Sequence, residues 1–174
     1  PIRLYDYQPS RGGYHAEEFL KGFSGYLICD GFSGYNKLKD IIRYGCLAHM
    51  RRYWHDALPG QTKKSPDKTP AEIGVDYCNQ LFELEKEYAD LDADTRKAKR
   101  LETEPAIWEA YWSWLETVNP AGGSRLAKAV TYAKNQKPYM ENYLLDGRCS
   151  ISNNIAENIA RPYAVGRKNF LFHD

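Results

Sequence analysis

The chain has 174 residues, of which 43% are hydrophobic and 14% aromatic, so it is long and apolar enough to fold as one domain with a buried core. Its formal net charge is +1, so any binding of nucleic acid must come from local basic patches and not from a global field. No apolar run reaches the roughly 18 residues of a membrane helix, so we predict no membrane segment. No signal peptide opens the chain, and the four scattered cysteines form no Cys-x-x-Cys pair. These features predict a protein of the reducing cytoplasm without disulfides.

The first third of the chain predicts short strands and helices in alternation. Ile2–Tyr7 alternates apolar and polar residues, as a half-buried strand does, and Ala16–Phe23 carries the spacing of a short helix. Tyr26–Cys29 is a continuous apolar run, which is typical of a strand buried on both faces. A short helix over Lys37–Arg43 and a second buried strand over Tyr44–His49 are expected to follow.

Asp30 comes directly after the first of these buried strands. One interpretation is turn chemistry, because Asp30-Gly31 is a common turn pair and the Asp side chain bonds nearby backbone. The other is a ligand-binding carboxylate, because α/β folds place such groups at the carboxyl ends of buried strands. The residues alone leave both interpretations open.

A basic segment follows the second predicted strand. Met50–His55 mixes cations with aromatic rings, and residues 43 to 68 hold six Lys or Arg against two Asp. This composition suits contacts with phosphates and stacking on bases, although a solvated basic face has the same pattern. Cys46 and His49 have the gap of a zinc-ligand pair, but no second pair lies nearby, so we do not predict a zinc site.

The middle of the chain predicts a helical insertion. Leu58–Lys68 is a polar, proline-punctuated linker, and Thr69–Glu72 has the cap, the N1 proline and the capping-box Glu of a helix start. Apolar residues then recur at helical spacing at about residues 73–91 and at 95–118 with a restart at Pro105, which predicts a helical hairpin inserted into an α/β domain. Two more helices are predicted beyond it, one after a cap at Ser124 and one at 137–145.

The last segment, Ile151–Phe172, begins with an amide-rich helix start. Residues 152 to 154 are all good N-caps, and if Asn154 is the cap, Glu157 falls at the reciprocal position of a capping box. The other interpretation of Glu157 is a metal ligand in a phosphoryl-transfer site, because a carboxylate there is followed by three cations, Arg161, Arg167 and Lys168. A surface helix with an ion pair has a similar pattern, so local spacing does not decide. The two roles are also compatible if Ser152 or Asn153 caps the helix and leaves Glu157 free.

Four blocks of the sequence, in this order, resemble the signature blocks of the insertion sequence 66 family of bacterial transposases. They are Asp30–Tyr35, Gly45–Arg52, Ser152–Glu157, and Arg161-Pro162 with Gly166–Phe172. The resemblance implies an α/β fold of the ribonuclease-H-like class, a mixed sheet flanked by helices. It also implies a helical insertion between the last core strand and the Glu-bearing helix, and we expect core over residues 1–58, linker and insertion over 59–123, and the C-terminal helical part of the core over 124–174.

The resemblance further implies a DDE-type triad, two Asp and one Glu, that holds two Mg²⁺ or Mn²⁺ ions. Asp30 matches the second acidic residue and Glu157 the third, so both would be catalytic residues and metal ligands. The first Asp of the family lies upstream of the strand equivalent to Ile2–Tyr7, and Asp6 is on a later strand. Because the chain also starts at Pro1 without Met, we expect a fragment of a longer transposase with an incomplete active site.

The partners implied by the resemblance are DNA, both transposon ends and target, and other copies of the protein in a homo-oligomer in the bacterial cytoplasm, at the nucleoid. Five cations would contact phosphates without reading sequence: Arg51, Arg52, Arg161, Arg167 and Lys168. His49 and Asn154 are auxiliary candidates, with His49 more suited to orienting a neighbour than to touching the scissile phosphate. Two alternatives remain, a catalytically incomplete DNA-binding or assembly module and another ribonuclease-H-like nuclease or resolvase.

Overall fold

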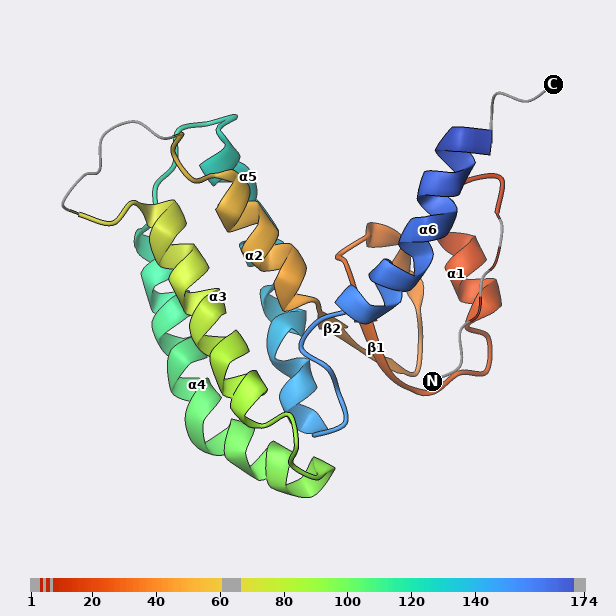
Figure 1. Ribbon diagram of the computed structural model, residues 1–174, viewed down its shortest axis with the longest axis horizontal. Coiled ribbons are helices and arrows are strands. Elements are labelled where there is room, and N and C mark those ends of the chain that lie inside the picture. The colour runs from red at the N-terminus through yellow and green to blue at the C-terminus, as the bar shows by residue number, and fades with distance from the viewer. Residues whose placement is uncertain (1–3, 5, 7, 61–66, 171–174) are drawn as a thin grey trace.

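The computed structural model describes residues 4, 6, 8–60 and 67–170, without the side chains of residues 160, 163–164 and 166–170. This part of the chain is mostly helical, with one small sheet (Figure 1). Its elements, in chain order, are α1 (Gly13–Phe19), β1 (Gly25–Cys29), the 3-10 helix η1 (Ser33–Lys37), β2 (Ile41–Gly45), α2 (Leu47–Asp56), α3 (Pro70–Glu87), α4 (Ala93–Thr117), α5 (Arg125–Met140), the 3-10 helix η2 (Glu141–Leu145) and α6 (Asn154–Phe170).

The sheet of the described residues consists of β1 and β2, which run parallel with Gly25 opposite Ile41 and Cys29 opposite Gly45. Both strands therefore end at the same edge. The predicted strand at Tyr26–Cys29 is present, but only Cys29 is fully buried and the residues before it are half-buried. The expectation of burial on both faces is thus wrong for most of β1. The predicted strand at Ile2–Tyr7 lies outside the described residues except for Leu4 and Asp6.

Two predictions around β2 are wrong. A strand replaces the helix expected over Lys37–Arg43, and a helix begins at Leu47, inside the strand expected over Tyr44–His49. The reason is packing, since Leu47, Met50 and Trp54 recur at helical spacing and all three are buried in the core. The first helix is also displaced from its predicted position, beginning at Gly13 and ending at Phe19.

The helices α2 to α5 pack together as one bundle, and Figure 1 shows α6 extending away from it. The predicted start of α3 is confirmed, because Glu72 donates its N–H to Thr69 Oγ1 at 3.3 Å and accepts from the Thr69 N–H at 2.7 Å. The cap at Ser124 is also confirmed, whereas α4 runs through Pro105 without a restart. The helix expected over residues 137–145 is instead the end of α5 followed by η2.

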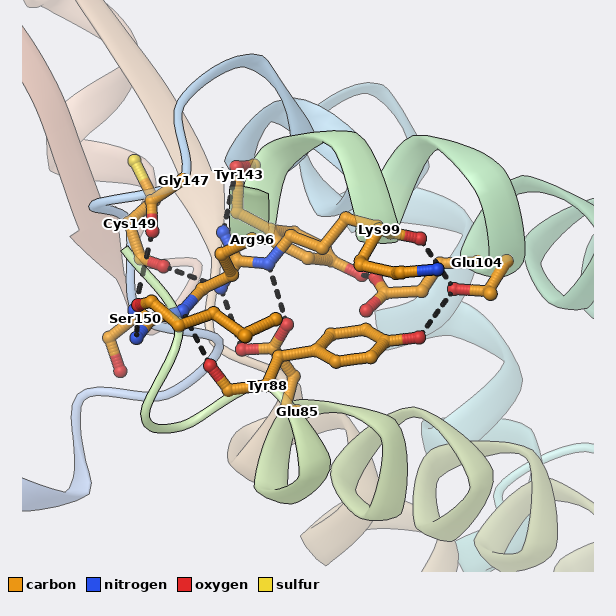
Figure 2. A network of polar contacts seen from close by, with 12 residues as sticks. Glu85, Tyr88, Arg96, Lys99, Glu104, Tyr143, Gly147, Cys149 and Ser150 are labelled. Atoms are coloured by element: carbon orange, nitrogen blue, oxygen red, sulfur yellow. Dashed lines mark hydrogen bonds and ion pairs between the residues drawn. The ribbon is translucent and has the colours of Figure 1, made fainter. Parts of the chain in front are cut away.

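A buried polar network joins α3 and α4 to the segment 143–150 that leads towards α6 (Figure 2). Arg100 of α4 is fully buried and forms a two-pronged ion pair with Glu85 of α3, with both N–O distances at 2.6 Å. The same guanidinium donates to the Cys149 carbonyl at 2.8 Å. The α3–α4 hairpin, which lies inside the predicted insertion, therefore fixes the chain just before α6.

All four cysteines are buried free thiols. Among the described residues, no helix combines the length and the apolar character that crossing a bilayer demands.

Candidate functional site

Asp30 lies at the edge where both strands end. It directly follows β1, its side chain is exposed, and its Oδ1 accepts from the Phe32 N–H at 3.0 Å. The Tyr132 hydroxyl of α5 donates to the Asp30 carbonyl at 3.1 Å, which anchors the turn to the bundle. The two interpretations of Asp30 are therefore compatible, because one oxygen shapes the turn while the carboxylate stays at the strand end.

Glu157 lies near the start of α6 and faces α2. Its Oε1 is 3.2 Å from His49 Nε2 and its Oε2 is 3.6 Å from an Arg52 Nη2. The capping-box interpretation is wrong, because α6 begins at Asn154 and the reciprocal position of the box therefore falls on Ala156. The Glu157 carboxylate is consequently used for contacts with another element.

Main-chain contacts bring the segments that precede the two acidic residues to one edge of the sheet. The Cys46 N–H donates to the carbonyl of Cys29, the residue before Asp30, at 3.1 Å. The next N–H, of Leu47, donates at 3.0 Å to the carbonyl of Ile151, which is three residues before α6. In the part of the chain that the structure describes, no hydrogen bond or ion pair joins Asp30 to Glu157 directly.

His49 bridges α2 and α6 from a largely buried position. Its side chain is 14% exposed, Nε2 faces Glu157, and within the described residues Nδ1 is buried without a hydrogen-bond partner. A ring held in this way fits the role of orienting the Glu157 carboxylate.

The predicted phosphate-binding residues fall into three groups. Arg51 and Arg52 line a groove of about 470 Å³ between α2, α3 and the start of α6, which His55, Asn79, Phe82 and Asn154 also line. Within it Arg51 Nε donates to the Asn79 side chain at 2.8 Å, and Arg52 contacts Glu157. Arg161 is exposed one turn beyond Glu157. The side chains of Arg167 and Lys168 lie outside the described residues.

The oxygen ligands that Mg²⁺ and Mn²⁺ prefer are present, since Asp30 and Glu157 are both carboxylates from elements that meet at one edge. Among the described residues, no three His, Cys, Asp or Glu side chains converge as a metal site. The donor chemistry therefore fits the expected ions, and a third ligand is needed to complete a triad.

Sequence reasoning missed three residues that contact the site. Tyr132 anchors Asp30, Asn79 holds Arg51, and Asn153 contacts the Cys46 thiol. Only Asn153 had a local signal, because it lies among the N-cap candidates of the last helix, but its spacing gives no indication of the contact with Cys46.

The comparisons with known proteins cover the whole chain. Residues 1–174 match the family model described as Transposase IS66 family. Two similar proteins of Sinorhizobium fredii, described as uncharacterized proteins y4qI and y4hP, are 32% and 27% identical over 99% of this chain and 33% and 34% of their own lengths. The chain thus spans about a third of these relatives, and no solved structure matches it. The chain therefore belongs to the IS66 family of transposases.

Proposed function

We propose that this chain is part of the catalytic domain of a DDE-type transposase that cleaves DNA and transfers the cut strand during insertion-sequence mobility. The observation that carries the proposal is the meeting of the two acidic signature blocks at one sheet edge. Asp30 follows β1. At the same edge, the Leu47 N–H donates to the carbonyl of Ile151, in the segment that leads to the helix of Glu157. Asp30 and Glu157 are 127 residues apart in numbering (157 − 30), so only the fold can bring the segments that carry them to the same edge.

The sheet is proposed to belong to a larger ribonuclease-H-like mixed sheet. Two parallel strands, a carboxylate at the end of the first and a helix directly after the second support this fold. The first acidic residue of the triad would come from a strand that precedes the Ile2–Tyr7 segment in the longer protein.

Asp30 and Glu157 would hold the divalent ions, two Mg²⁺ or Mn²⁺ in the complete site. When bound, such ions supply Lewis-acid stabilisation of charge on the phosphoryl oxygens and lower the pKa of a bound water or hydroxyl. The residues of this chain hold the site in place: His49 orients Glu157, and Arg52 keeps a positive charge beside the same carboxylate.

DNA would lie over the groove between α2 and α3. Arg51 and Arg52 line it, and a cationic groove suits phosphates because each contact releases a condensed counterion. Arg161, Arg167 and Lys168 of α6 would extend this contact along the backbone of transposon ends or target. The protein would act at the bacterial nucleoid as a homo-oligomer that pairs two DNA ends.

A second candidate function is a DNA-binding or assembly module without catalysis of its own. It is favoured by the same groove, because the Arg51 and Arg52 that line it would contact DNA phosphates without any metal.

The test uses the full-length protein and a labelled transposon end. Asp30→Asn and Glu157→Gln should each abolish Mg²⁺-dependent cleavage while DNA binding, measured by fluorescence anisotropy, stays near that of the unaltered protein. Glu109→Gln, an exposed Glu on α4, is the matched control and should cleave normally. Wild-type cleavage by either site variant contradicts the enzyme. DNA binding by a full-length protein that never cleaves supports the module.

A further inference from the structure

Cys46 links the two acidic blocks through separate contacts. It is fully buried between β2 and α2, and its N–H donates to the Cys29 carbonyl, next to Asp30. Its carbonyl accepts from the His49 N–H at 3.1 Å, which sets the first turn of α2. The backbone of this one residue is therefore bonded to the strand of Asp30 and to the helix turn that carries His49.

The thiol of Cys46 reaches the other side of the site. Sγ donates to Asn153 Oδ1 at 3.0 Å and accepts from the Asn153 N–H at 3.5 Å. The carbonyl of Asn153 in turn accepts from the Glu157 N–H at 3.0 Å. Asn153 is thus held at both its side chain and its main chain, one helical turn before the acidic residue.

The chemistry of the thiol matches this arrangement. Burial raises the pKa of Cys46 by more than the backbone N–H groups of Asn153, His49 and Ala48 lower it, so the thiol stays protonated and can donate. The contact with Asn153 uses both capacities of a neutral thiol, since sulfur donates to the amide oxygen and accepts from the backbone N–H.

We propose that Cys46 is a positioning residue that sets the separation of Asp30 and Glu157, by holding the strand end through its backbone and the start of α6 through its thiol. The proposal rests on the function proposed above, and it gives Asn153 the matching role on α6. Neither residue touches substrate. Their effect is on the geometry of the two carboxylates, and a small displacement of such groups is enough to slow a reaction about 100-fold.

The experiment compares variants of the full-length protein in cleavage of a labelled transposon end. Cys46→Ala and Asn153→Ala remove the thiol–amide contact from either side, and Cys46→Ser restores a donor and an acceptor on a shorter arm. Cys78→Ala is the matched control, because Cys78 is equally buried but lies on α3. For each variant, kcat, KM for DNA and the Mg²⁺ concentration for half-maximal rate are measured, with amide hydrogen exchange at residues 153–157.

Both alanine variants should lower kcat and raise the Mg²⁺ requirement by about 10- to 100-fold, with KM for DNA unchanged. Exchange at residues 153–157 should accelerate, Cys46→Ser should recover part of the rate, and Cys78→Ala should cleave normally. Wild-type kcat, Mg²⁺ requirement and exchange in Asn153→Ala, or in Cys46→Ala, overturn the positioning role.

These outcomes separate the two proposals. If Glu157→Gln is inactive while Cys46→Ala and Asn153→Ala behave as wild type, the enzyme stands and the positioning role fails. If Glu157→Gln cleaves at the wild-type rate, the proposed function itself fails. Asn153→Ala keeps the positioning test decisive even if a buried Cys46 variant does not fold, because Asn153 is only half-buried.

Discussion

The residue at which α6 begins decides the role of the Glu157 carboxylate. Had α6 begun one residue later, Glu157 would have closed a capping box on its own helix. Because the helix begins at Asn154, the side chain faces α2 and meets His49 and Arg52. The candidate metal ligand is therefore already held by two neighbours before any metal or DNA arrives.

A test at this scale concerns His49. His49→Phe keeps a ring in the largely buried site but removes the nitrogen that faces Glu157 at 3.2 Å. We expect cleavage by the full-length protein to fall by about 10- to 100-fold, as it does when a residue that orients a ligand is lost, with DNA affinity unchanged. His49→Gln, which can again donate to the carboxylate, should recover part of the rate. Equal rates for the Phe and Gln variants would show that the nitrogen is not used.

The acidic residues of the site could be predicted from the sequence, but the residues that support them could not. Asp30 and Glu157 could be selected because each lies in a recognisable local block. The contacts that support them could not, since Cys46 and Asn153 are 107 positions apart and Tyr132 lies 102 positions from Asp30. Nothing in the local pattern of one partner indicates the other, because such pairs are chosen by packing of the whole chain.

At the scale of elements, the sequence predicts helix caps correctly but misplaces segments whose structure depends on packing against distant parts of the chain. The capping box at Thr69 and the cap at Ser124 were predictable because donor and acceptor lie within three residues of each other. The strand β2 was not, because the helix after it is stabilised by the burial of Leu47, Met50 and Trp54 against other helices. The position of that burial depends on segments far away in the sequence.

The contact between α4 and η2 contains a carboxyl group that makes stability depend on pH. Glu104 is fully buried, accepts from the Tyr143 hydroxyl, and has one oxygen without a partner among the described residues. Burial raises its pKa to about 7, from 4.5 in the unfolded chain. The folded state therefore binds this proton more tightly. The resulting stability is fully present below about pH 4.5 and is lost as the pH rises through about 7.

Urea unfolding between about pH 5 and pH 8 tests this dependence. We expect the free energy of unfolding to fall by up to about 1.4 kcal/mol per pH unit from this group. Glu104→Gln keeps a neutral side chain at every pH and should flatten the profile across that window. Glu109→Gln, exposed on the same helix, should leave the wild-type profile unchanged. Parallel profiles for wild type and Glu104→Gln would assign the dependence to other groups.

At the scale of the whole chain, the net charge of +1 means that the proposed DNA affinity must come from where the cations lie. Arg51 and Arg52 line the groove between α2 and α3, whereas Lys99 on the exposed side of α4 is paired with Glu102 at 2.9 Å. The groove and the two carboxylates of the family's signature blocks lie in one region near the strand ends. This chain, with a net charge of only +1, would then bind DNA through this region.

The salt dependence of binding measures that localisation. Replacing Arg51 and Arg52 together by Gln should weaken DNA binding and reduce the slope of log K against log salt by about 1.8 for duplex DNA, since each lost phosphate contact removes about 0.9. Lys99→Gln should leave the slope unchanged. The measurement is fluorescence anisotropy with the full-length protein at several salt concentrations. An unchanged slope in the double variant would remove the groove from the DNA interface. A reduced slope with intact folding would place DNA phosphates beside the two carboxylates that are proposed to hold the catalytic ions.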